Sequence, residues 1–233
     1  KACLRLKSYE QYERTGYRFD GRNQFLRTSD ASANRFPIDG IKPRTISAWV
    51  KIDPDQSGRG TVVMWGTNAA KSQFGLDIEM VRQGTKMGAL PVLNFNCASI
   101  RPQQPIDLLR DGAWYHIAVI FSAPGSGEVN PSTTRMYVDG VAIPTLFIEC
   151  LANPGKVIST GRSALFIGRD IGDRQSGFKG VISDLRIWQK SLTIAEIKDL
   201  AGREPAADQN VAGLQLSLPL DSYAAGTVVN RGA

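Results

Sequence analysis

Two carboxylates, Asp77 and Glu79, stand two positions apart in the stretch Gly75-Leu-Asp77-Ile-Glu79. Side chains alternate between the two faces of a strand, so a strand here places both acids on one face. Paired acids on one face are the machinery of glycoside hydrolysis. Gly75 shares that face and supplies no carboxylate. The pattern therefore favours polar residues on a strand face over a catalytic set.

His116 is the only histidine of the chain and lies within Trp114-Tyr-His-Ile-Ala-Val. Hydrolysis of the serine type needs a histidine beside a nucleophile and an orienting acid. No G-x-S-x-G nucleophile elbow occurs in the sequence. We therefore predict no catalytic residue and expect that the protein is not an enzyme.

Sugar recognition commonly combines an exposed aromatic ring with amide, acid and arginine groups. Trp49, Trp114 and Trp188 lie inside strongly patterned strands, which favours the core. Trp65 stands next to a Gly-Thr-Asn loop, so it is open to both readings, core or binding ring. Arginine also suits sulfate and carboxylate groups. The predicted ligand-binding set is Trp65, Asn68, Lys71, Asp77, Glu79, Arg82 and Arg101.

The three cysteines are Cys3, Cys97 and Cys150, and no pair has C-x-x-C spacing. This argues against a zinc or redox motif. Cys97 and Cys150 each end a strand-like run, so a Cys97–Cys150 disulfide in an oxidising compartment is one reading. Three buried free thiols are the other, and the sequence leaves both open.

The elements that must position these residues are short strands separated by polar, glycine and proline turns. A period of two in hydrophobicity marks them, and Asp139-Gly140 is a hairpin turn signal. Strands at this spacing favour an antiparallel sandwich over βαβ units. The predicted strands cover 16–27, 44–52, 61–65, 73–80, 90–97, 113–121, 134–143, 163–168 and 178–188.

A short helix is predicted after the last of these strands. Thr193 followed three residues later by Glu196 is a capping box. Ile194, Ile197 and Leu200 then recur at helical spacing.

Five blocks between residues 17 and 200 carry a family resemblance: TISAWVKI, WYHIAVIF, MYVDGVAI, LFIGRD and FKGVISDLRIW. In this order they resemble the laminin G-like and pentraxin-like domains of the concanavalin A-like lectin/glucanase superfamily. The resemblance implies an all-β fold, an antiparallel jelly-roll sandwich with one short C-terminal helix. Fold alone does not carry function with it.

The resemblance also bears on catalysis and on metal binding. Glucanases of this superfamily carry a pattern like Glu-x-Asp-x-Glu, and Gly75 stands where their nucleophile would be. Many relatives bind calcium through carboxylates and backbone carbonyls. Asp184 resembles a frequent family aspartate, which implies a structural Ca²⁺ held with the region of Asp20 and Asn23. Asp170 and Asp173 are further calcium candidates.

Net charge is +6 and the sequence pI is about 9.3, with lysine and arginine spread along the chain. This favours a solvated basic surface, with attraction to an acidic polysaccharide as the alternative. We find no nucleic-acid-binding motif, so no nucleic acid partner is expected. No run of about 18 apolar residues occurs, so no membrane span is expected either.

We divide the chain into a sandwich domain at 1–202, a linker at 203–212 and a tail at 213–233. The tail resembles the opening strand of the same family, so it begins a further domain, packs back on a sheet, or pairs with a neighbouring molecule. The resemblance implies non-catalytic recognition of glycans or glycosylated proteins, extracellular or at a cell surface. The alternatives are a structural subunit that contacts copies of itself or other subunits through the tail strand and, third, a degenerate or unrecognised glycoside hydrolase.

Overall fold

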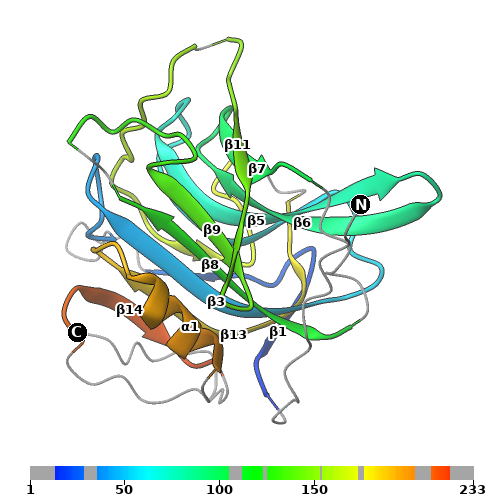
Figure 1. The fold of residues 1–233 in the computed structure, drawn as a ribbon. Coiled ribbons are helices and arrows are strands. Elements are labelled where there is room, and N and C mark those ends of the chain that lie inside the picture. Colours follow the sequence, from blue (N-terminus) through cyan, green and yellow to red (C-terminus); the bar gives the residue numbers. More distant parts are fainter. Residues whose placement is uncertain are drawn as a thin grey trace.

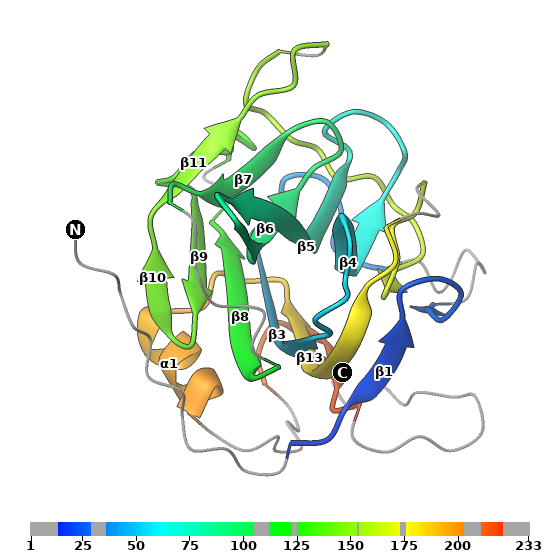
Figure 2. The same cartoon turned by 90° about the vertical axis from the view of Figure 1, so that its right-hand side faces the viewer.

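A computed structural model describes residues 14–28, 36–104, 112–122, 125–152, 154–172, 176–202 and 211–220. They form two antiparallel sheets of seven strands each, stacked face to face (Figures 1 and 2). The predicted all-β sandwich is confirmed. Sheet A has the order β1 (Tyr17–Asp20), β13 (Lys179–Trp188), β3 (Arg44–Ile52), β8 (Trp114–Phe121), β9 (Thr134–Val138) and β10 (Val141–Ile143), with β14 (Leu214–Leu218) paired to β13.

Sheet B is the layer seen above sheet A in Figure 2. Its order is β11 (Thr145–Ile148), β7 (Ser99–Pro102), β6 (Lys86–Asn94), β5 (Gln73–Gln83), β4 (Arg59–Gly66), β12 (Phe166–Ile167) and β2 (Leu26–Arg27). The long β5–β6 hairpin forms the centre of this sheet, with Asp77 opposite Val92 and Gly75 opposite Asn94.

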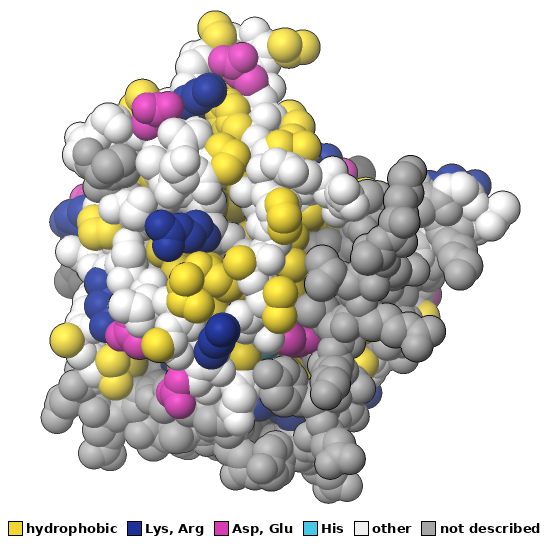
Figure 3. All heavy atoms as spheres, in the orientation of Figure 1, with side chains coloured by type: hydrophobic (Ala, Val, Ile, Leu, Met, Phe, Trp, Pro, Cys, Tyr) yellow, Lys and Arg dark blue, Asp and Glu magenta, His cyan; other side chains and the backbone are white. Residues whose placement is uncertain are grey.

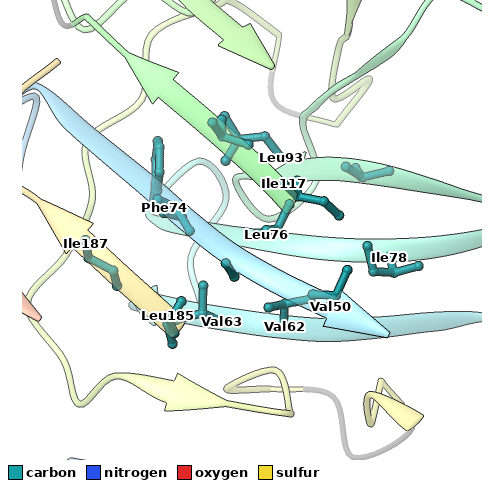
Figure 4. Close-up of a cluster of buried hydrophobic side chains, with 14 of the residues drawn as sticks. Val50, Val62, Val63, Phe74, Leu76, Ile78, Leu93, Ile117, Leu185 and Ile187 are labelled. Atoms are coloured by element: carbon teal, nitrogen blue, oxygen red, sulfur yellow. The ribbon is translucent and has the colours of Figure 1, made fainter. Parts of the chain in front are cut away.

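The core lies between the two sheets and follows the period of two that the sequence shows. Val50 and Ile117 of sheet A and Leu76 and Ile78 of sheet B meet there, and all four are buried (Figure 4). Burying one such side chain contributes roughly 1.5–3 kcal/mol. Because alternate residues of β5 are fixed inward, Gly75, Asp77 and Glu79 are fixed outward.

The predicted helix is α1 (Ile194–Gly202), and its capping box is formed. The Glu196 amide donates to Thr193 Oγ1 at 3.2 Å, and the Thr193 amide donates to Glu196 Oε2 at 2.6 Å. Ile197 and Leu200 pack with Ala118, Ile120, Tyr137 and Trp188 on the outer face of sheet A. α1 therefore covers part of that face and leaves the outer face of sheet B to be considered for binding (Figure 1).

The tail strand β14 pairs with β13 of its own chain, with Leu218 opposite Leu185 and Leu216 opposite Ile187. The register of β13 shifts at Asp184, which has a positive φ of 51°. Residues 203–210 and 221–233 lie outside the described residues. The division into domain, linker and tail stays a prediction.

Candidate functional site

The outer face of sheet B carries a group of polar side chains that we call the polar face. Strand register brings them together: Arg59 lies opposite Glu79, and Asn94 lies between Gly75 and Ser99 on the neighbouring strands. The polar face consists of Arg59, Asp77, Glu79, Asn94, Ser99 and Arg101.

Asp77 is the buried centre of the polar face. Asn94 Nδ2 donates to Asp77 Oδ2 at 2.7 Å, and Arg59 Nε lies 3.6 Å from the same oxygen. Asp77 Oδ1 is buried, and the geometry gives it no hydrogen-bond donor among the described residues. Burial raises the pKa of Asp77 to about 6, against the opposing effects of Arg59 and Asn94. Desolvation therefore outweighs the nearby cation.

Arg59 joins Asp77 to a second acid, because its Nη2 also lies 3.0 Å from Asp170 Oδ2. Asp77 and Asp170 have side-chain exposures of 0% and 6%. Both carboxylates are thus enclosed and held by one guanidinium, so neither is presented to a glycosidic bond in solvent.

Glu79 and Arg101 form the open part of the polar face together with Arg59. Arg101 Nη1 and Nη2 lie 3.1 and 2.9 Å from the two oxygens of Glu79, a bidentate pair. Arg101 Nε donates to Ser99 Oγ at 3.2 Å. The side chains of Arg59, Glu79 and Arg101 are 34%, 26% and 36% exposed. A ligand can reach these three groups.

Gly75 lies on the same face, and the space beside it is already filled. A Cβ at this position would lie 2.5 Å from Met64 Sδ and 2.6 Å from the backbone oxygen of Val63. A carboxylate side chain at position 75 therefore has no room without movement of the β4 backbone. Packing around Gly75 agrees with the missing acid in the sequence.

Trp65, which we expected to be a candidate binding ring, is a core residue. It is completely buried between Phe36 and Phe74, and its Nε1 donates to the Ile38 oxygen at 2.8 Å. A ring enclosed in this way cannot stack on a sugar. The expectation of a binding role for Trp65 is wrong, because the register of β4 shifts between Thr61 and Val63, so that Trp65 faces the core although Thr61 faces outward.

Of the other predicted ligand residues, Lys71 and Arg82 lie apart from the polar face, and Asn68 lies at its edge, where Asn96 Nδ2 donates to Asn68 Oδ1 at 3.5 Å and the Asn96 amide donates to Asn94 Oδ1. Lys71 is buried, and its amine donates to the Pro154 and Gly155 oxygens at 2.8 and 3.1 Å, so it ties two loops together. Asn68 is exposed in the β4–β5 loop. Arg82 is exposed but shares the strand parity of Ile78, opposite to that of Glu79. Lys71 and Arg82 therefore do not belong with Asp77, Glu79 and Arg101, whereas a binding role for Asn68 stays a prediction.

The residues that the resemblance implies as calcium ligands lie too far apart to bind one ion. Asp20 pairs with Lys179 across β1 and β13, and Asp184 lies five residues farther along β13, about 16 Å away. Asp184 Oδ2 accepts from Arg186 Nη1 at 2.9 Å, and both side chains are buried. Asp20 Oδ1 accepts three backbone amides, from Arg22, Asn23 and Gln24, which lower the pKa of Asp20.

Asp20 and Asp184 therefore have separate hydrogen-bond partners, and Asn23 contributes its backbone amide to Asp20. Within the described residues, no cluster of three or more His, Cys, Asp or Glu has a metal-binding arrangement. Asp173 lies outside those residues.

Cys97 and Cys150 form a disulfide with a Cα–Cα distance of 5.0 Å. The bond joins the β6–β7 turn to the loop after β11. The loop of Lys71 lies in the same region, because the Lys71 amide donates to the Asn96 oxygen at 3.0 Å. One end of the sandwich is thus fastened covalently, outside the polar face. Cys3 lies outside the described residues.

Sequence reasoning did not select Arg59, Asn94 or Ser99, because strand pairing brings them to the face of Asp77 from three other strands. It also missed an aromatic and arginine group on the same sheet. Phe25 and Phe166 stack with ring centroids 6.3 Å apart. The guanidinium carbons of Arg169 and Arg27 lie 4.7 Å from the Phe25 centroid and 5.6 Å from the Phe166 centroid.

The basic residues are dispersed on the face seen in Figure 3. There, lysine and arginine side chains lie singly among hydrophobic, acidic and neutral ones. The described part of that face shows no single basic patch, as the spread of lysine and arginine along the sequence predicted. No helix in the described residues has the length and apolar character to cross a membrane.

A curated relative matches part of the chain. It is the sushi, von Willebrand factor type A, EGF and pentraxin domain-containing protein 1 of Rattus norvegicus, 24% identical over 161 residues. The match covers 62% of this chain and only 4% of that much longer protein.

Solved structures share the fold at low sequence identity. A candidate carbohydrate-binding protein from Bacteroides ovatus has a TM-score of 0.60 at 20% identity, covering 91% of this chain and 54% of that one. A heptameric SAP-like pentraxin from Limulus polyphemus has a TM-score of 0.56 at 20% identity, covering 79% and 80%. Trypanosoma rangeli sialidase has a TM-score of 0.52 at 17% identity, covering 80% and 27%. The fold thus occurs in a carbohydrate-binding candidate, in a pentraxin and in part of a sialidase chain.

The profile of the concanavalin A-like lectin/glucanases superfamily matches residues 20–198, which span both sheets from the end of β1 into α1. The expected resemblance is confirmed, and the chain belongs to the concanavalin A-like lectin/glucanases superfamily.

Proposed function

We propose that this chain is a non-catalytic module that binds glycans, free or attached to proteins, through its polar face. The observation that carries the proposal is the half-exposed set Arg59, Glu79 and Arg101 on the outer face of sheet B. Their acids and guanidiniums are held in place by each other, so a ligand meets an ordered surface with little side-chain entropy left to lose.

The Glu79–Arg101 pair has bonding capacity left for a sugar. Three of the five N–H groups of Arg101 point to Ser99 and Glu79, which leaves two donors. Glu79 retains acceptor lone pairs on both oxygens. Neighbouring hydroxyls of a sugar ring can accept from one partner and donate to the other. The pair therefore suits recognition of a diol.

The same geometry argues against hydrolysis. A retaining glycosidase needs a nucleophile and an acid on opposite sides of the scissile bond. Here Asp77 and Asp170 are buried and share Arg59, while Gly75 has no carboxylate and no space for one. The similarity to a carbohydrate-binding candidate agrees with a binding role, and the sialidase shares only the fold.

An extracellular or cell-surface setting is part of the proposal. The Cys97–Cys150 bond supports it, because disulfides persist in oxidising compartments. The pentraxin domain-containing relative is consistent with the same setting.

A glycan array probed with the purified chain tests the function. We expect binding to a subset of sugars, and the best ligand is then titrated against Arg101→Gln. Loss of one charge-assisted contact predicts an affinity about ten-fold lower. Arg82→Gln is the control, because Arg82 is exposed with the opposite strand parity. A blank array, or equal affinities of the two variants, would count decisively against the polar face.

A further inference from the structure

The Phe25–Phe166 pair and its two arginines form a compact group that we call the aromatic–arginine stack. The two rings are nearly parallel, with an interplanar angle of 26°. Each ring has a guanidinium within cation–π distance, Arg169 over Phe25 and Arg27 over Phe166. Stacking of this kind fixes the plane of a guanidinium and leaves its N–H groups directed along that plane.

The aromatic–arginine stack lies on the same side of sheet B as the polar face. Register places Arg27 opposite Phe166, Phe166 opposite Met64, and Met64 opposite Gly75. Phe166 and Gly75 are therefore two strands apart, about 10 Å. Arg169 is also followed directly by Asp170, whose carboxylate contacts Arg59 of the polar face. The two groups form neighbouring parts of one surface.

Arg169 differs from Arg18, Arg101 and Arg162 in lacking an acidic partner among the described residues. Arg18 pairs with Asp53, Arg162 with Asp39, and Arg101 with Glu79. Arg169 forms no hydrogen bond or ion pair with the described residues, and its Nε is buried without an acceptor. Arg169 as a whole is half-buried, so part of the residue remains exposed to solvent.

We propose that the aromatic–arginine stack is a subsite for an acidic group of the glycan, a carboxylate or a sulfate. The proposal rests on the proposed function, since the neutral part of the same ligand would occupy the polar face. A planar guanidinium binds an oxyanion through two parallel N–H bonds, and prior stacking on Phe25 lowers the entropy cost of holding it. A neutral sugar offers Arg169 no comparable partner.

The test compares polymers that differ only in the acidic group. Dextran sulfate and dextran form the sulfate pair, and polygalacturonate and its fully methyl-esterified form provide the carboxylate pair. Affinities are measured with the complete chain at a fixed ionic strength of about 0.15 M, because salt screens surface charges. The variants are Arg169→Gln and its control Arg162→Gln, which removes the same charge from an exposed arginine paired with Asp39.

We expect at least one acidic polymer to bind ten-fold or more tightly than its neutral partner. Arg169→Gln should remove most of that preference, and Arg162→Gln should change the affinity by less than two-fold. The polymer pair that shows the preference identifies the acidic group as a sulfate or a carboxylate. Phe25→Leu should also weaken the preference while keeping the charge, since Arg169 then loses the ring that orients it.

Three results would overturn the subsite. Equal weakening by both arginine variants would mean unspecific charge attraction. Equal binding of acidic and neutral polymers, still sensitive to Arg101→Gln, would remove the subsite and leave glycan binding intact. Failure of the unaltered chain to bind any of the polymers, together with a blank array, would remove the proposed function as well.

Discussion

Replacement of Asp77 by asparagine should make the protein more stable at neutral pH. Burial raises the pKa of Asp77 to about 6 from its ordinary value of 3.8. A raised pKa means that the folded state favours the neutral carboxyl. The contribution of Asp77 to the free energy of unfolding is therefore fully present below about pH 3.8 and is lost as pH rises through 6. Asparagine is always neutral and keeps an oxygen for Asn94.

The magnitude follows from the size of the shift. A difference of about two pKa units corresponds to about 3 kcal/mol at 1.36 kcal/mol per unit. The Arg59 contact at 3.6 Å works in the opposite direction and is already included in the net shift. We therefore expect Asp77→Asn and the unaltered chain to have equal stability near pH 4, and the variant to be more stable by up to about 3 kcal/mol at pH 7.5.

Urea unfolding at several pH values between 4 and 7.5 measures this difference. Asp139, whose pKa burial also raises to about 6, is present in both proteins, so its effect cancels in the comparison. A stability difference that does not vary with pH would show that Asp77 titrates normally. A variant less stable at pH 7.5 than the unaltered chain would show that Arg59 outweighs burial, and the reasoning about this buried acid would fail.

Other perturbations have equally definite outcomes. The double substitution Cys97→Ala and Cys150→Ala should lower the free energy of unfolding by about 4 kcal/mol, because the bond closes a separation of 53 residues, and urea unfolding would show it. Gly75→Glu should lower the melting temperature without producing any sugar hydrolysis, because its Cβ meets Met64 Sδ and the Val63 oxygen; released reducing ends would contradict this. Burial, with Arg14 and Arg186, lowers the pKa of His116 from 6.5 to about 3, so the stability it confers is present above pH 6.5 and is lost as pH falls toward 3. His116→Gln should make the free energy of unfolding depend less on pH below 6.5. An unchanged pH dependence would show that protonation of His116 does not destabilise the fold.

The fold could be predicted because its determinants are local. Alternation in TISAWVKI and WYHIAVIF fixes which side chains face the core, and Ile46, Val50, Ile117 and Val119 are all buried there. Thr193 and Glu196 fix the start of α1 through bonds to each other's backbone. Each signal lies within a few residues, so no knowledge of the pairing partner is needed.

The site was predicted only in part, since it depends on strand order. Asp77 and Glu79 share a face by alternation, but Arg59, Asn94 and Arg101 reach them from three other strands. A single sequence shows parity within a strand and not which strand lies beside it. Trp65 was misjudged because a register shift between Thr61 and Val63 turns it toward the core, and regular alternation along a strand does not reveal such an irregularity.

On sheet B, arginine side chains supply the positive charge that a bound calcium ion would otherwise provide to the acids. Two carboxylates close enough to share a partner repel each other unless a cation lies between them. Arg59 supplies that cation to Asp77 and Asp170 from within the chain, just as Arg101 does for Glu79. Neutralised in this way, the acids of the polar face act as hydrogen-bond acceptors without creating a strong negative field. In the subsite that we propose, an acidic glycan would then not be repelled, and Arg169 would be the charge that selects it.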